Sequence, residues 1–285
     1  VAAGLLMQRS GDLQNADRMY LQALKFAPAN ADLLSARAEL LLKRSRFVDA
    51  VKSAQAALKL NPDSLIAKAV LGKCLAYAGE YAGAQKYLKD TYEKGNVDAD
   101  LALAYSEVLM RRRMFADALA PTLVATPFAV GKPEKLRFLK KRCEFLINKL
   151  TAEQVSNAIK LAELKLKNSK SANLYYFCLG DMFDVLNRKP EAIACYKKGL
   201  QRDPQYGRGH LRLGMDLEDF SADYDRALKE YEFAYLLLPH DDEIKLRHDR
   251  LSSRMKKSTR DIAWQIKTAG RKMKAANVQQ RIQIL

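Results

Sequence analysis

The sequence is poor in the residues that form loops, cross-links and metal sites. Its 285 residues include 13 Gly, 8 Pro, 4 Cys and 3 His, too few loop-forming residues for a turn-rich β fold or a disordered chain. No Cys-x-x-Cys pair occurs and no His lies at ligand spacing from a Cys, so neither a zinc site nor a disulfide framework is expected. We expect the four cysteines to be small buried residues in a reducing compartment.

Signals for a membrane span or for catalysis are also missing. No stretch of about 18 uncharged apolar residues is present, so the sequence predicts no transmembrane helix. It contains neither a Gly-rich phosphate loop, G-x-x-x-x-G-K-[ST] or G-x-G-x-x-G, nor a G-x-S-x-G nucleophile motif. We therefore predict no catalytic, cofactor-binding or metal-binding residue and no enzyme activity, in a protein of the cytoplasm.

Positive charge is in excess. The sequence has 49 Lys and Arg against 33 Asp and Glu, a net charge of +16. A field of this size attracts acidic protein segments, nucleic acid or anionic lipid, without distinguishing among them.

Small residues, an aromatic residue and a proline recur with a period of about 34 residues. One set is Gly4, Ala16, Tyr20, Ala23 and Pro28, and the same spacing recurs in Gly180, Ala192, Tyr196, Gly199 and Pro204. Small residues let two helices cross closely, the aromatic residue fills the space between units, and proline ends the second helix. Since one helix pair cannot bury its apolar face alone, successive pairs are expected to stack.

This spacing resembles the tetratricopeptide repeat family over residues 1–239. The resemblance implies an all-α, right-handed superhelical solenoid of about seven antiparallel helix pairs with a C-terminal capping helix region. Four units fall in residues 1–126 and three in residues 134–239, with a basic helical cap and tail at 240–285. A start in mid-helix without Met further predicts that the sequence is a piece of a longer chain.

Two departures interrupt the period. Residues 127–133 shift the phase by about six residues, which predicts either a hinge or a rigid insertion loop. The fifth unit has Leu146 where Gly or Ala is expected.

The resemblance places the first helix of each pair along a concave groove. Their mixed charges favour a partner segment with both charged and apolar contacts, a helix or an extended peptide. The candidate groove residues are Glu39, Lys73, Tyr77, Glu107, Arg111, Asp181, Asp184, Arg208, Arg212, Met215 and Glu218.

Some relatives clamp the acidic C-termini of heat-shock chaperones with Lys, Asn and Arg. Arg208 and Arg212 match the last element of that clamp, but Cys143, Ile147 and Cys178 stand where its earlier residues would be. A standard carboxylate clamp is therefore not expected.

Basic residues cluster at the turns within pairs and in the C-terminal region. The candidate basic edge consists of Arg44, Arg46, Arg112, Arg113, Arg188 and Lys189, and a C-terminal basic face consists of Arg260, Lys267, Arg271 and Lys274. The edge is interpreted either as ordinary solvated turns or as a surface for acidic protein tails, such as those of tubulin, or for RNA. The C-terminal region is interpreted as a cap of the last unit, with or without an acidic partner.

These observations favour a non-catalytic scaffold or adaptor, a subunit of a larger assembly whose partners are proteins with acidic segments. By analogy of fold, cytoskeletal, ciliary and transport assemblies are the expected settings. An RNA-binding or RNA-processing adaptor is the alternative, although the groove has few aromatic residues for stacking. A cochaperone without the standard clamp comes third.

Overall fold

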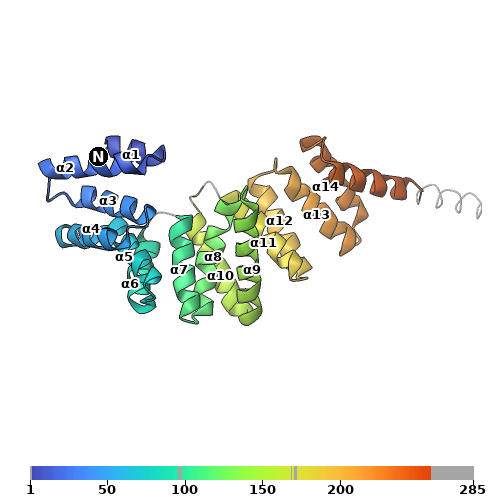
Figure 1. The fold of residues 1–285 in the computed structure, drawn as a ribbon. Coiled ribbons are helices and arrows are strands. Elements are labelled where there is room, and N and C mark those ends of the chain that lie inside the picture. The colour runs from blue at the N-terminus through green and yellow to red at the C-terminus, as the bar shows by residue number, and fades with distance from the viewer. Residues whose placement is uncertain (1, 96–97, 168, 170–171, 258–285) are drawn as a thin grey trace, which may run out of the picture. The chain divides into compact units, whose positions relative to one another are not determined.

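The computed structural model describes residues 2–95, 98–167, 169 and 172–257, and these residues form helices and turns with no strand among them. The chain divides into two compact units, residues 1–175 and 176–285. Figure 1 shows the succession of helices along the chain. The expectation of an all-helical fold is confirmed.

Seven helix pairs follow one another in the described part of the chain. Those that begin in the first unit are α1 (Ala2–Arg9) with α2 (Leu13–Phe26), α3 (Ala31–Lys43) with α4 (Phe47–Leu60), α5 (Leu65–Tyr77) with α6 (Tyr81–Lys94), α7 (Ala99–Arg111) with α8 (Phe115–Ala125), α9 (Pro133–Lys149) with α10 (Ala152–Leu166), and α11 (Ala172–Val185), which continues into the second unit. The second unit adds α12 (Lys189–Arg202), the partner of α11, and α13 (Gly207–Asp219) with α14 (Tyr224–Leu237). Residues 242–257 form a further helix, called here the C-terminal helix.

The 34-residue period sets where helices begin. The side chains of Asn30, Ser64 and Asp98 accept hydrogen bonds from backbone N–H groups in the first turns of α3, α5 and α7. These residues lie 34 apart and are residue types that satisfy the free N–H groups at a helix start. The spacing of these caps therefore fixes the start of three successive pairs.

The turns within pairs follow the same period. Gly11 and Gly79 have positive φ angles, and Ser45 and Arg113 adopt φ of 58° at the equivalent places. Positive φ is strained for a residue with a Cβ atom. The repeat thus imposes this turn even where the sequence does not supply glycine.

A glycine in such a turn should stabilise the protein. Ala222 has φ of 50° and is exposed, so Ala222→Gly removes strain without removing contacts. We expect about 0.5–1 kcal/mol of added stability in urea unfolding, as the relief of strain exceeds the entropy cost of glycine. Ala194→Gly, at an exposed position inside α12, is the control and should destabilise by about 1 kcal/mol. Equal effects of the two substitutions would contradict the turn assignment.

The small residues lie where the helices cross. A Cβ atom added to Gly180 would lie 2.5 Å from the ring of Tyr196, and one added to Gly4 would lie 2.7 Å from the ring of Tyr20. Both rings are fully buried. The role that the sequence predicts for the small and aromatic positions is therefore confirmed in both units.

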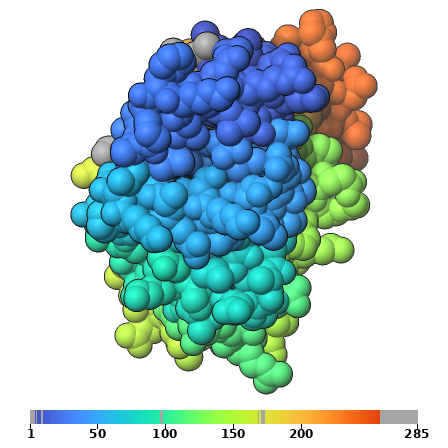
Figure 2. All heavy atoms as spheres, turned by 60° about the vertical axis from the view of Figure 1, so that its left-hand side comes forward, coloured from blue at the N-terminus to red at the C-terminus, as the bar shows by residue number. Residues whose placement is uncertain are grey.

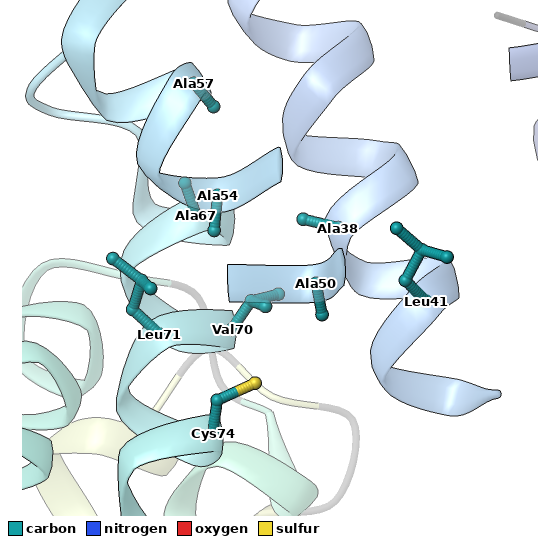
Figure 3. Packing of buried hydrophobic residues seen from close by; sticks show 9 residues of the cluster. All are labelled: Ala38, Leu41, Ala50, Ala54, Ala57, Ala67, Val70, Leu71 and Cys74. Atoms are coloured by element: carbon teal, nitrogen blue, oxygen red, sulfur yellow. The ribbon is translucent and has the colours of Figure 1, made fainter. Parts of the chain in front are cut away.

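Alanine makes up much of the core between the second and third pairs. Figure 3 shows this cluster, in which alanines from α3, α4 and α5 pack around larger side chains. Its members are Ala38, Leu41, Ala50, Ala54, Ala57, Ala67, Val70, Leu71 and Cys74. In the space-filling view, the first three pairs form successive layers from dark blue to teal (Figure 2).

The fifth pair differs from its neighbours. Residues 118–125 of α8 are all buried, and α8 packs against both α9 and α10. Leu146 is fully buried at the crossing position that is small in other pairs.

The insertion lies inside the first unit. It contains a short 3-10 helix, η1 (Pro127–Ala129), whose Pro127 and Ala129 are buried. Whether residues 127–133 act as a hinge stays a prediction.

All four cysteines are buried, as expected of small core residues. Within the described ranges, no helix has the length and apolar character needed to cross a membrane. The same residues contain no group of three or more His, Cys, Asp or Glu side chains suited to a metal ion.

Candidate docking surfaces

Two arginines of the predicted basic edge bind a buried carboxylate of the preceding repeat. Asp17, on α2, is 5% exposed. The guanidinium of Arg44 lies 2.8 Å from its carboxylate, with Arg37 at 3.0 Å and Arg46 at 3.6 Å. Arg44 and Arg46 therefore serve partly as links between the first two pairs, which reduces the positive field that they present to a partner.

The same link recurs two repeats later in a weaker form. Arg112 donates a hydrogen bond to the side-chain oxygen of Gln85, and these residues lie 68 positions after Arg44 and Asp17. Because Gln85 is uncharged, the positive charge of Arg112 is not offset by this partner. Residues 111, 112 and 113 are all exposed. This 111–113 turn is thus the part of the first unit's basic edge with least internal neutralisation.

In the second unit, Lys189 is an internal counter-ion. Its ammonium group binds the carboxylates of Asp184 and Asp216, the latter at 2.9 Å. Asp216 is 2% exposed, and burial raises the pKa of its carboxyl group while Lys189 opposes that shift. Arg188 pairs with Glu191 at 2.8 Å and lies over the ring of Phe183. The positive charges of Arg188 and Lys189 are therefore largely offset by carboxylates of the chain.

The groove candidates of the first unit are partly paired. Glu39 lies 3.0 Å from Lys43. Lys73 is partly buried. Tyr77 is 73% exposed, beside Phe47 at 5.0 Å between ring centroids. Its exposure makes Tyr77 the most accessible aromatic candidate in this part of the groove.

Glu107 joins two first helices. Its carboxylate binds Arg111 at 3.1 Å and also binds Arg142 of α9. The side chain of Arg142 is 10% exposed, and its Nη1 atom is buried without a hydrogen-bond partner. Glu107 and Arg111 therefore form one network with α9.

The groove candidates of the second unit also pair with one another. Asp181 accepts a hydrogen bond of 2.8 Å from the Tyr196 hydroxyl and lies 3.9 Å from Arg212. Arg208 lies 3.5 Å from Asp241. Met215 is partly buried beside Arg212. The two arginines that resemble the end of a carboxylate clamp thus face carboxylates of the chain itself.

Glu218 anchors the C-terminal helix. It is 7% exposed, accepts a hydrogen bond of 2.8 Å from the Tyr231 hydroxyl and pairs with Arg250 at 3.0 Å. Ile244 and Leu251 of the C-terminal helix are fully buried. The described part of this helix therefore covers the last pair, as the sequence predicts for a cap. The basic face formed by Arg260, Lys267, Arg271 and Lys274 lies outside the described residues.

A basic and aromatic surface on α9 was not predicted. The helix contains six basic and two acidic residues, and Phe138 and Phe145 are 51% and 43% exposed. The ammonium of Lys149 lies 5.5 Å from the Phe145 ring centroid, and the Arg142 guanidinium lies 4.6 Å from that of Phe138. A count of charges along residues 133–149 would have revealed it.

We define the α9 face as Arg137, Phe138, Lys141, Phe145 and Lys149. Phe145 packs edge-on against Phe115 with ring centroids 5.8 Å apart. Since Phe115 begins α8 immediately after the 111–113 turn, this contact brings the end of the α9 face near that turn. Among the described residues, no carboxylate pairs with Lys141 or Lys149.

Comparison with known proteins matches part of the chain to a family model. The family model described as tetratricopeptide repeat matches residues 1–64, which span α1 to α4. No curated protein sequence matches the chain.

Solved structures with a similar succession of helices include YrrB, described as a TPR protein with an unusual peptide-binding site. It is 16% identical, with 81% of this chain and 97% of that chain covered and a TM-score of 0.38. TTC0263, a thermophilic TPR protein of Thermus thermophilus, is 16% identical over 78% of this chain and 98% of that one, with a TM-score of 0.32. A chain of the APC/C hetero-tetramer Cut9-Hcn1 is 14% identical, with 88% and 42% covered and a TM-score of 0.40.

The stacked helix pairs define a helical-repeat protein, a class in which each repeat contacts its neighbours and leaves extended surfaces for partners. Residues 1–64 match the tetratricopeptide repeat model, and turns and crossing residues of the same spacing continue beyond them.

Proposed function

We propose that the chain is a non-catalytic scaffold that docks an acidic segment of a partner protein on the α9 face and the 111–113 turn. The observation that carries this proposal is the combination of exposed aromatic rings with basic side chains, of which Lys141, Lys149 and Arg113 have no carboxylate partner among the described residues. Acidic segments with apolar residues are the ligands that complement such a surface. The expected setting is a larger cytoplasmic assembly that displays acidic protein tails, cytoskeletal and ciliary assemblies among them.

RNA is the second candidate ligand, favoured by the same charge. Binding of single strands uses aromatic rings as stacking platforms. The cations over Phe138 and Phe145 each cover one face of these rings, so less ring surface is available for bases. A protein segment, which needs only apolar contact and carboxylates, fits better. A cochaperone role receives less support, because Arg208 and Arg212 face carboxylates of the chain.

The proposal predicts binding of an acidic model peptide. The probe is a fluorescein-labelled peptide of about eight glutamates and two phenylalanines, titrated by anisotropy at low salt. Lys141→Glu together with Lys149→Glu should weaken binding ~10-fold, about 1.4 kcal/mol, since two attractions become repulsions. Raised salt should weaken binding of the parent in the same direction.

The matched control reverses Lys52 and Lys59, two exposed lysines seven residues apart on α4. That variant should bind within about two-fold of the parent, because each exposed charge away from the site contributes little. Equal losses in both variants would refute a specific surface. A single-stranded RNA of about 12 nucleotides that bound more tightly than the peptide and lost affinity on the α9 reversals would instead support the RNA alternative.

A further inference from the structure

A cleft of about 670 Å³ opens in the first unit, on the side of the second helices rather than along the predicted groove. It is lined by residues of α6, α8 and α10 and by Tyr105 of α7. The volume falls in the range of sites that hold ligands or the anchoring side chains of a partner.

Two leucines on α10 are exposed in the cleft. Leu161 is 61% exposed and Leu164 is 71% exposed, and both line the cleft. Residues three apart on a helix lie on the same face, so the two side chains form one apolar stripe. Ala120 and Pro121 of α8 also line the cleft and add apolar surface with short side chains.

Two tyrosine hydroxyl groups in the cleft have no hydrogen-bond partner among the described residues. The rings of Tyr92 and Tyr105 lie 5.3 Å apart, and neither hydroxyl forms a hydrogen bond with a described residue. Tyr105 is 7% exposed. Burial raises the pKa of both phenols, that of Tyr105 to about 12, so both remain hydrogen-bond donors. Pro121 has no N–H group for the carbonyl of Asp117, which therefore stays available as an acceptor.

The cleft is electrically neutral in a strongly basic chain. Its charged lining consists of Lys89 and Lys165 against Glu93 and Asp117, a sum of zero. Lys165 also has an internal role, because its ammonium group donates hydrogen bonds to the backbone carbonyls of Glu93 at 3.2 Å and Gly95 at 2.9 Å at the end of α6. An acidic peptide or a nucleic acid therefore gains no charge complementarity here.

From these features we infer that the cleft binds a neutral amphipathic helix of a partner protein. Bulky apolar residues of that helix, three or four positions apart, pack against Leu161 and Leu164. The free donors and acceptor of the cleft bind its polar side chains. This surface differs from the α9 face in location and chemistry, so it does not depend on the function proposed above.

The test is selection from a displayed library of random peptides of about 14 residues, roughly four helical turns, against the whole protein. The expected peptides are neutral and carry apolar residues at helical spacing. Their affinity should fall at least ~10-fold in Leu161→Glu with Leu164→Glu. It should be unchanged in Leu236→Glu, a matched control at a 76% exposed leucine of α14, and in the Lys141→Glu, Lys149→Glu variant.

Because both leucines are exposed, the double variant should keep the thermal unfolding of the parent, and circular dichroism checks this. Two results would overturn the inference. One is enrichment only of acidic peptides that ignore the leucine substitutions, and the other is the absence of any enriched helical pattern. Loss of the neutral peptides in the α9 variant as well would show that the two surfaces are one.

Discussion

Ala192→Arg is expected to abolish stable folding of the repeats around α12. Ala192 is fully buried one turn from Tyr196, whose ring fills the crossing beside Gly180. Arginine would place a long charged side chain into a fully buried site that holds only a methyl group. Overpacking and the burial of a charge together are expected to cost about 4 kcal/mol or more.

Thermal unfolding followed by circular dichroism measures this effect. Ala194→Arg is the control, since Ala194 lies two residues away on the exposed side of α12 and its replacement should cost less than about 0.5 kcal/mol. A variant at Ala192 that unfolded at the temperature of the parent would show that the packing of this repeat has been misplaced.

Lys189→Met should have the second largest effect, a loss of about 3 kcal/mol at neutral pH. The substitution leaves the buried carboxylate of Asp216, which already has an unpaired Oδ2 atom, without its positive partner. Breaking a buried ion pair by removing one member costs more than the pair itself contributes, because a charge remains uncompensated. Arg188→Met is the control: its pair with Glu191 is partly exposed on both sides and should contribute less than about 1 kcal/mol.

The loss in Lys189→Met should shrink as the pH falls. Burial raises the pKa of Asp216 above its ordinary value, and removal of Lys189 takes away the main opposing influence. A carboxyl group with a raised pKa in the folded state binds more protons folded than unfolded, so protonation favours the fold as pH falls through that raised pKa. Urea unfolding at pH 7.5 and pH 5 compares the two states, and a penalty that grew at pH 5 would contradict this assignment.

The regular part of the fold could be predicted from the sequence because it depends on local spacing. The crossing residues, such as Gly180 with Tyr196, act within one repeat and so recur at fixed distances along the chain. The fifth pair was harder, because α8 packs against both α9 and α10. That arrangement is decided by packing among three helices and is not visible in a single repeat.

The ion pairs of the surface could not be predicted from charge counts, which do not show which ions pair. Arg44 was interpreted as part of either a solvated turn or a partner surface, and it reaches Asp17, 27 residues earlier, in the preceding repeat. The recurrence of the same spacing in Gln85 and Arg112 was present in the sequence and could have indicated such links. The cleft beside Leu161 and Leu164 could not have been foreseen, because its walls come from helices about 70 residues apart in sequence.

The central claim, that an acidic partner segment docks on the α9 face and the 111–113 turn, is tested most directly by locating a bound peptide. A benzophenone placed at the centre of the acidic model peptide is photo-crosslinked to the whole protein, and mass spectrometry of the digest identifies the modified residues. The account predicts that crosslinks concentrate within residues 111–149 and disappear in the Lys141→Glu, Lys149→Glu variant. Crosslinks concentrated in the second unit, or spread evenly over exposed lysine-rich surfaces, would contradict it.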